Sequence, residues 1–397
     1  MHGYGGGRRA TGANSNRVFS AMEANAPSLR TLRTVATTSA AKSSCSLISQ
    51  YDAYIGRLLR TAFVRKPEIL SSSDRKLSFE ALNQFESIEA AREFILEKEV
   101  ESVLRSSHAD QFKWIEKSFD LVLTKDLASW PSFVEIAERR NLFVHTDGVI
   151  SSQYIAVCKA HKHPLDKSTK EGERLQVSQE YFKSAHHCIF EIGVKLGHVQ
   201  WRKLLPEERD DADQNLIALT YELIDNGDFD LAIRILDFAC TDFKKFANEG
   251  NQLALIVNRA QAYKWKGDND RCKKLMRAVD WSAKGDQFKL AEATLAEDWS
   301  KAAKIMNRIG KGGAIDEVSY RDWPLFRDFR KTEQFLSEYA DIFGEAFTTK
   351  TQSKNDSLGQ LTGPDAGALG DSSEEPAPNS LVLENGSGNN PEEYGLH

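Results

Sequence analysis

Three polar side chains in the stretch Glu138–Gly148, which reads ERRNLFVHTDG, could act together on a phosphate group. His145 carries an imidazole, which takes up or releases a proton near neutral pH because its ordinary pKa lies near ~6.5. Arg140 has a permanent charge on a planar guanidinium that fits phosphate oxygens, and Asn141 can donate a hydrogen bond to the same group. These residue types predict acid–base chemistry on a phosphate ester.

The spacing of these residues decides how they can meet. Asn141 and His145 are four residues apart and Glu138 lies on the same stripe, so a helix would present all three on one face. His145 would lie in the last turn, where the helix dipole favours its protonated form. Arg140 projects about 140° away from His145 on an ideal helix. Its long side chain, a distorted helix end or a second copy of the motif would have to bring its charge to the same phosphate.

Plainer interpretations of these residues stay open. His145 could cap the end of a helix, and Arg139 and Arg140 could form a solvated basic face. The runs CKAHKH (158–163) and HHC (186–188) contain possible metal ligands, but their spacing fits no standard structural zinc site. There is also no glycine-rich phosphate loop and no serine nucleophile elbow. The sequence therefore predicts neither a metal nor a cofactor.

Helical periodicity predicts the elements that hold this stretch, because apolar residues recur at helical spacing and proline is rare. One long helix is expected over residues 87–117, with Ser87 as its N-cap. A second is expected over 129–148 and a third over 176–204. Helices of these lengths fit a bundle over about residues 46–205.

The helix expected over 129–148 carries the candidate motif and has signals at both ends. Pro131 falls in its first turn, and Ser132 and Glu135 have the spacing of a capping box. Gly148 supplies the C-terminal stop. The helix should therefore place His145 in its last turn.

A short sequence pattern repeats in the second half of the chain. Asn226–Ala232 recurs as Lys266–Cys272 and, more weakly, as Ala296–Ala302, each time between two apolar helical segments. This pattern resembles the tetratricopeptide helix–turn–helix, in which a Gly-Asp turn reverses the chain. The spacing is irregular and the third copy has Glu in place of Gly. A stack of helical hairpins without a binding groove is an equal alternative to a working peptide-binding array.

The candidate motif resembles the signature of the HEPN superfamily (higher eukaryotes and prokaryotes nucleotide-binding domains). That signature is an Arg, usually followed by a polar residue, with a His four to six residues further on near a helix end. Arg140, Asn141 and His145 match it, and the segments 138–155 and 50–70 resemble the bacterial versions of the domain.

The resemblance covers about residues 47–200 and implies a fold and an activity. It implies a helical bundle that commonly dimerises, so that two motifs meet in one cleft. Active members of the superfamily are metal-independent endoribonucleases of toxin–antitoxin, abortive-infection and antiviral systems. Other members have lost catalysis and serve as helical dimerisation or nucleotide-sensing modules.

Composition limits the class of protein. The chain of 397 residues has a net charge of −6, which argues against a strongly basic nucleic-acid coat. The sequence contains no run of ~18 consecutive apolar residues, the length that a membrane-spanning helix requires. The cysteines are odd in number and never form a C-x-x-C pair, which favours reduced thiols in the cytoplasm. They are Cys45, Cys158, Cys188, Cys240 and Cys272.

We therefore expect an all-α chain of four parts. Residues 1–45 should be a disordered extension, because they are rich in Gly, Ser, Thr and Ala; a transit peptide or an early start codon are alternatives. Residues 46–205 should form the HEPN-like bundle and 206–345 the tetratricopeptide-like hairpins. Residues 346–397 should be a disordered acidic tail, because they contain too little apolar sequence to form a core.

The expected function is cleavage of RNA by Arg140, Asn141 and His145 in stress response or phage defence. A homodimer through the bundle and a protein partner or antitoxin on the hairpins are expected with it. The alternative is a non-catalytic helical interaction protein with a structural HEPN-like dimerisation module. The Arg140-Asn141-His145 set favours the first interpretation, because a purely structural module has no physical need of it.

Overall fold

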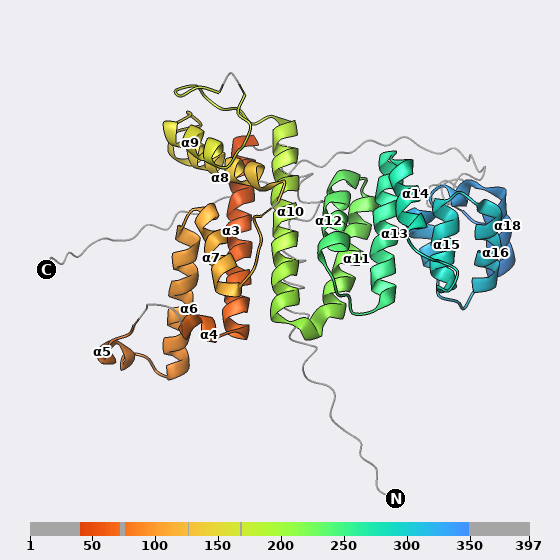
Figure 1. Cartoon of the computed structure of the whole chain (residues 1–397), viewed down its shortest axis with the longest axis horizontal. Coiled ribbons are helices and arrows are strands. Elements are labelled where there is room, and N and C mark those ends of the chain that lie inside the picture. Colours follow the sequence, from red (N-terminus) through yellow and green to blue (C-terminus); the bar gives the residue numbers. More distant parts are fainter. Residues whose placement is uncertain (1–39, 72–75, 126, 167–168, 349–397) are drawn as a thin grey trace, which may run out of the picture. The chain divides into compact units, whose positions relative to one another are not determined.

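The computed structural model describes residues 40–71, 76–125, 127–166 and 169–348 (Figure 1). These residues are helical along most of their length and form no strand. The prediction of an all-α fold is therefore confirmed for this part of the chain.

The two ends that were expected to be disordered fall largely outside the described residues. Helix α3 (Ala40–Arg65) begins within the extension expected at 1–45. At the other end, α18 (Glu333–Phe343) finishes just before the tail expected at 346–397. Residues 1–39 and 349–397 lie outside the description.

The first part of the described chain is a bundle that contains the candidate motif. Helix α3 is followed in chain order by α4 (Glu68–Ser71), α5 (Phe79–Leu82), α6 (Ile88–Arg105), α7 (His108–Phe119), α8 (Trp130–His145), α9 (Ser152–Ala160) and α10 (Gln179–Leu204). Helix α3 packs against α6, α8 and α10. The core between these helices and α7 is apolar, and its most buried side chains include Leu59, Phe63, Phe112, Phe133 and Ile192.

The long helix predicted over 87–117 is wrong, because the chain breaks there into α6 and α7. Ser87 caps α6 as expected, with its Oγ accepting from the Ala90 amide at 3.0 Å. Ser107 then acts as a second N-cap and accepts from the Asp110 amide at 3.2 Å. The buried Gln111 amide donates to the Ser106 carbonyl at 3.1 Å. This bond satisfies a backbone group that the break leaves without a helical partner.

Helix α8 begins near the predicted residue, but its start is built differently. Pro131 does lie in the first turn. The predicted capping box of Ser132 and Glu135 does not form, because the Glu135 carboxylate is buried and bonded to side chains of α9 and α10. Ser129 is the N-cap residue, and its side chain makes no capping bond.

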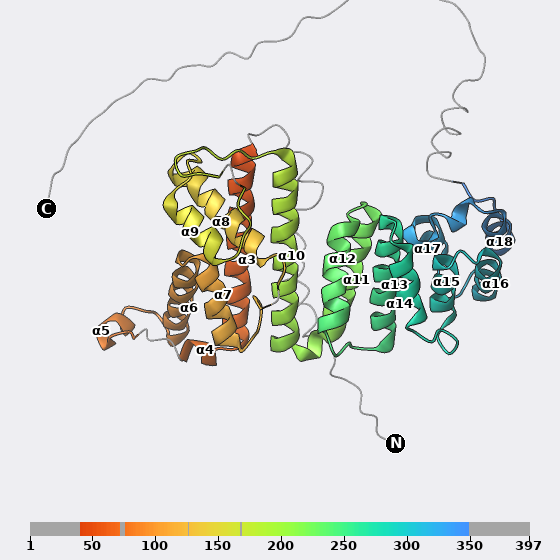
Figure 2. The same ribbon diagram turned by 45° about the horizontal axis from the view of Figure 1, so that its top comes forward.

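Three helical hairpins follow the bundle at the positions of the repeated pattern. They consist of α11 (Arg209–Asp225) with α12 (Phe229–Asp242), α13 (Glu249–Lys266) with α14 (Asn269–Arg277), and α15 (Asp286–Leu295) with α16 (Trp299–Ile309). The 3-10 turn η2 (Pro206–Glu208) connects them to α10. Helix α10 packs against α3 and α8 and also against α11 and α12, and Figures 1 and 2 show it between α3 and α12.

The three turns share one backbone geometry. Gly227, Gly267 and Glu297 each have a positive φ, of 80°, 98° and 60°. In each turn the amide of the following Asp donates to the carbonyl five residues earlier, and the pairs are Asp228–Leu223 at 2.9 Å, Asp268–Tyr263 at 2.9 Å and Asp298–Ala293 at 3.0 Å. This is the pattern of a Schellman C-cap. Glu297 therefore takes the position of a glycine without changing the turn.

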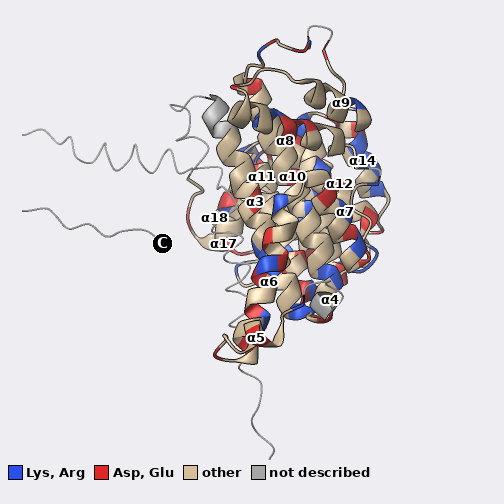
Figure 3. Cartoon of the chain, turned by 90° about the vertical axis from the view of Figure 1, so that its left-hand side faces the viewer, with Lys and Arg blue, Asp and Glu red and all other residues tan. Residues whose placement is uncertain are grey.

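The last elements cover the end of the third hairpin. They are α17 (Glu317–Asp322), η3 (Pro324–Phe326), η4 (Phe329–Lys331) and α18. Tyr320, Phe326, Phe329 and Phe335 form their buried aromatic cluster. No described helix combines the length and apolar composition that a membrane crossing requires. Figure 3 shows basic and acidic residues interspersed along the helices.

Candidate functional site

Helix α8 stays regular through His145, so a distorted helix end does not bring Arg140 toward His145. The long side chain of Arg140 turns instead, and its Nη1 donates to Asn141 Oδ1 at 3.2 Å. Both residues are half-buried. Arg140 Nε is buried and has no hydrogen-bond partner among the described residues. The guanidinium thus lies beside Asn141.

Helix α3 lies close to this pair. Burial raises the pKa of the Cys45 thiol near the start of α3, and the positive charge of Arg140 partly offsets that effect. Helix α3 also packs against α8.

His145 is exposed in the last turn of α8, as the sequence predicts, and the residues after it are firmly held. Thr146 Oγ1 donates to the Leu142 carbonyl at 3.0 Å. The Gly148 amide donates to the same carbonyl at 3.0 Å. The imidazole therefore projects from a fixed backbone into solvent.

Gly148 is required at this helix end. Its φ is 81°, and an added Cβ would lie 2.7 Å from the ring of Phe143. Asp147 before it also has a positive φ of 53°. Arg174 holds this residue by donating from Nε to the Asp147 carbonyl at 2.8 Å and by an ion pair with its carboxylate. An isolated antiparallel bridge joins Val149 to Arg174. The end of α8 is thus fixed by the segment that leads to α10.

Arg139, next to the motif, belongs to a different group of residues. Its Nε donates to the Glu135 carboxylate at 2.6 Å, and its guanidinium lies 3.9 Å from the ring centre of Tyr181. Glu135 also accepts from the hydroxyls of Tyr154 at 2.7 Å and Tyr181 at 2.9 Å. The interpretation of Arg139 as part of a solvated basic face is wrong, because its side chain is only 14% exposed. Arg139 thus forms a structural ion pair with Glu135, and the two tyrosines link the Glu135 carboxylate of α8 to α9 and α10.

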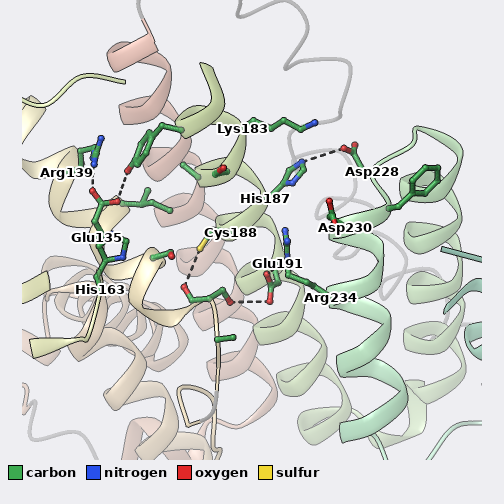
Figure 4. Close-up of a pocket in the computed structure, with 18 of the residues that line it drawn as sticks. Glu135, Arg139, His163, Lys183, His187, Cys188, Glu191, Asp228, Asp230 and Arg234 are labelled. Carbon is green, nitrogen blue, oxygen red and sulfur yellow. Dashed lines mark hydrogen bonds and ion pairs between the residues drawn. The ribbon is translucent and has the colours of Figure 1, made fainter. Parts of the chain in front are cut away.

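A pocket of ≈ 720 Å³ lies between α8, α10 and the turn before α12 (Figure 4). Arg140, Asn141 and His145 are not among the residues that line it. Its four acidic side chains are balanced by four basic ones, Arg139, Lys183, Arg234 and Lys266. Arg139 pairs with Glu135, Lys266 with Asp230, and Arg234 with Glu191 at 2.8 Å. His187 lies 3.5 Å from Asp228, but burial lowers the pKa of its imidazole. The pocket therefore has no strong preference for an anionic or a cationic ligand.

The cysteine and histidine runs do not assemble into a metal centre. Cys158 is buried in a small apolar cluster, and burial raises the pKa of its thiol to about 11. His161 Nδ1 lies 3.3 Å from the indole nitrogen of Trp130. His186 is buried in α10, where burial lowers its pKa to about 4. In the described part of the chain, no group of three or more such residues could hold a metal ion.

Sequence reasoning missed two features of this region. The Glu135 network spans α8, α9 and α10, and its only sequence signal is the four-residue spacing between Glu135 and Arg139. Glu138 is half-buried, and burial raises the pKa of its carboxyl group while the charge of His108 lowers it. His108 is in turn bonded to Asp52 at 2.9 Å between Nε2 and Oδ1. Nothing in the local sequence indicates that α3 and α7 meet α8 here.

Comparison of the chain with protein-family models, with curated proteins and with solved structures finds no match.

Proposed function

We propose that the chain is a metal-independent endoribonuclease in which Arg140, Asn141 and His145 act on one phosphodiester of RNA. The observation that carries this proposal is the hydrogen bond from Arg140 Nη1 to Asn141 Oδ1 at 3.2 Å. It holds the guanidinium beside Asn141, which shares one face of α8 with His145 by its four-residue spacing. This supports a site in which the guanidinium and the imidazole address one phosphate. The resemblance of this stretch to the HEPN motif points to the same chemistry.

RNA supplies its own nucleophile, the 2′-hydroxyl, so its cleavage needs no metal-activated water. One proton leaves that hydroxyl and another reaches the departing 5′-oxygen, and an imidazole can carry out either transfer. Arg140 stabilises the charge that develops on the phosphorane, and Asn141 orients the phosphate. The products are a 2′,3′-cyclic phosphate and a 5′-hydroxyl.

The proposal includes a homodimer, because two proton transfers need two groups. A C2 axis through the bundle would place a second His145 opposite the first. RNA is then the substrate, and the hairpins α11–α16 are the proposed contact for a protein partner such as an antitoxin. Stress response or phage defence is the corresponding cellular role.

The test is cleavage of labelled single-stranded RNA in the presence of EDTA. His145→Ala should reduce the rate by ~10²–10⁴-fold, the usual contribution of general acid–base catalysis. Arg140→Ala should cause a comparable loss. Arg92→Ala is the matched control, because Arg92 is an exposed residue of α6 away from the motif, and it should cleave at the wild-type rate. Arg139 is not a suitable control, because its loss would leave the buried Glu135 carboxylate without its ion-pair partner.

Two outcomes would contradict the proposal. Equal cleavage by the wild type and His145→Ala would identify a contaminating nuclease. Absence of cleavage by the wild type on several RNAs would favour the non-catalytic interaction protein, whose supporting observation is the series of three hairpins with one turn geometry.

A further inference from the structure

The second proton transfer needs a group that can hold a proton close to the same phosphate. Glu138, Asn141 and His145 follow one another on α8 at intervals of three and four residues, so they share one stripe. At 1.5 Å per residue, Glu138 and His145 are about 10 Å apart along the helix axis, with Asn141 between them. Arg140 Nη1 reaches this middle position through its bond to Asn141 Oδ1.

A phosphate bound at this middle position would have a carboxylate on one side and an imidazole on the other. In-line cleavage needs such an arrangement, because the attacking and the leaving oxygens lie on opposite sides of phosphorus. His145 is exposed, whereas Asn141 and Glu138 are half-buried. The stripe therefore runs from solvent toward the helices α3 and α7, and a backbone phosphate could approach it from the open end.

We propose that Glu138 is the second proton-transfer residue of the site and acts in the same chain as His145. This inference rests on the proposed function. In it, Glu138 takes the place of the partner's imidazole in the second proton transfer. The Glu138 carboxylate takes the proton of the 2′-hydroxyl, and the 2′-oxygen forms a bond to phosphorus. The bond from phosphorus to the 5′-oxygen breaks, and protonated His145 gives its proton to that oxygen. Solvent then returns a proton from Glu138 to His145, so both groups regain their starting states.

The surroundings of Glu138 make its carboxylate a stronger base than that of an exposed glutamate. Burial raises the pKa of its carboxyl group. From α7, the charge of His108 opposes this rise, and His108 is fixed by Asp52 of α3 at 2.9 Å. From α9, the nearby Cys158 thiol stays neutral because its own pKa is raised to about 11. Within α8, Arg139 forms its ion pair with Glu135 rather than with Glu138.

The experiment is the pH dependence of RNA cleavage by the full chain and its variants. Glu138 must be ionised to accept a proton, so the wild-type rate should rise with pH through its raised pKa. Glu138→Gln should lower the rate by ~10²-fold or more and remove the rise on the acid side. Glu138→Asp should keep that rise at a reduced rate. Glu171→Gln is the control, because it removes an exposed carboxylate from the same half of the chain, and it should leave the profile unchanged.

A second variant separates proton transfer from a structural role. His108→Gln removes the charge that lowers the pKa of Glu138 but retains a donor for Asp52, so the acid-side rise should move to higher pH. A merely structural Glu138 would give no such displacement.

The outcomes separate this inference from the function on which it rests. Loss of activity in His145→Ala together with a wild-type rate and profile in Glu138→Gln would overturn the inference and return the second transfer to the partner's imidazole. Cleavage that does not depend on His145 would overturn the proposed function itself. If Glu138→Gln does not fold, the profiles of Glu138→Asp and His108→Gln decide: an acid-side rise that His108→Gln leaves in place overturns the inference.

Discussion

His186 and His198 are the most deeply buried histidines of the described chain, with only 4% and 5% of their surface exposed. Burial lowers their pKa values to about 4 and about 3. His198 Nε2 lies 3.2 Å from Asn215 Oδ1, whereas its Nδ1 and His186 Nε2 have no partner among the described residues. Both rings are therefore neutral in the folded protein and become protonated readily only in the unfolded chain.

This difference predicts a loss of stability in mild acid. A histidine whose pKa is lowered on folding contributes stability above its unfolded pKa of ~6.5, and that contribution falls by about 1.4 kcal/mol per pH unit as the pH decreases below ~6.5. At pH 5 each residue should cost about 2 kcal/mol. Urea unfolding at pH 7 and pH 5 measures the effect, and His198→Gln should lose less stability between these pH values than the wild type. An equal loss in both proteins would show that His198 does not differ in protonation between the two states.

Single residues also show where sequence reasoning succeeds and where it stops. The position of His145 in the last turn of α8 follows from the glycine stop, a local signal. The role of Glu135 does not, because its partners Tyr154 and Tyr181 come from α9 and α10. Its spacing from Ser132 is that of a capping box, but burial among distant donors overrides that local preference.

At the scale of the elements, the three hairpin turns depend on positive φ angles. Gly227 and Gly267 have φ values of 80° and 98°, and added Cβ atoms would meet no other atom within 4 Å. Glu297 adopts the same conformation and lies 2.9 Å from Nζ of Lys264, whose side chain is only 7% exposed. Glu297 thus forms an ion pair while its backbone has a positive φ, which is unfavourable for a residue with a side chain. The turn keeps its geometry, but the third copy of the repeat lacks the glycine by which the other two are recognised in the sequence.

Alanine substitutions should separate conformational strain from crowding. Gly227→Ala and Gly267→Ala should each destabilise the protein by about 1–2 kcal/mol, because a side chain disfavours the left-handed region and no clash contributes. Gly193→Ala is the control of opposite sign: Gly193 lies inside α10, where an added Cβ would sit 3.6 Å from Tyr54, so it should stabilise by about 0.5–1 kcal/mol. Urea unfolding of the three variants measures these changes. Equal effects at all three positions would refute the role of φ.

Helices and turns are the level at which the sequence is most informative, because caps and periodicity act over a few residues. The three hairpins follow from the Asp that closes each turn, and Ser87 and Gly148 mark helix ends as expected. The break between α6 and α7 was not predicted, because Ser107 competes with a helical pattern that continues across it. The meeting of α3, α7 and α8 around Glu138 depends on contacts between distant segments, which local patterns do not encode.

At the scale of the whole molecule, the described residues up to Ala346 form one compact unit. Helix α10 belongs to both the bundle and the hairpins, because it packs against α3 and α8 as well as against α11 and α12. Glu191 on α10 accepts from Ser129 Oγ at 3.2 Å and pairs with Arg234 of α12 at 2.8 Å. A buried carboxylate thus connects the start of α8 to the first hairpin.

Self-association of the full chain tests the proposed dimer separately from catalysis. Light scattering at tens of micromolar should give twice the chain mass of 44.6 kDa. The physical reason is that a C2 axis would bring two copies of Arg140 and His145 into one cleft, so that two guanidinium charges would face a bound phosphate. A strict monomer would remove the partner from the mechanism, and cleavage by such a monomer would then depend on Glu138 and His145 of one chain.

The rate at which Cys188 is alkylated reports on the contact between α8 and α10. Its thiol is 7% exposed, donates to the Ser129 carbonyl at 3.5 Å, and has its pKa raised to about 12 by burial. At pH 8 only about one molecule in ten thousand carries the reactive thiolate in the closed form. Alkylation of Cys188 therefore requires the two helices to separate, and its rate measures how often they do so. Cys272 is buried in α14 and burial raises the pKa of its thiol, so its alkylation rate measures the opening of the second hairpin in the same way.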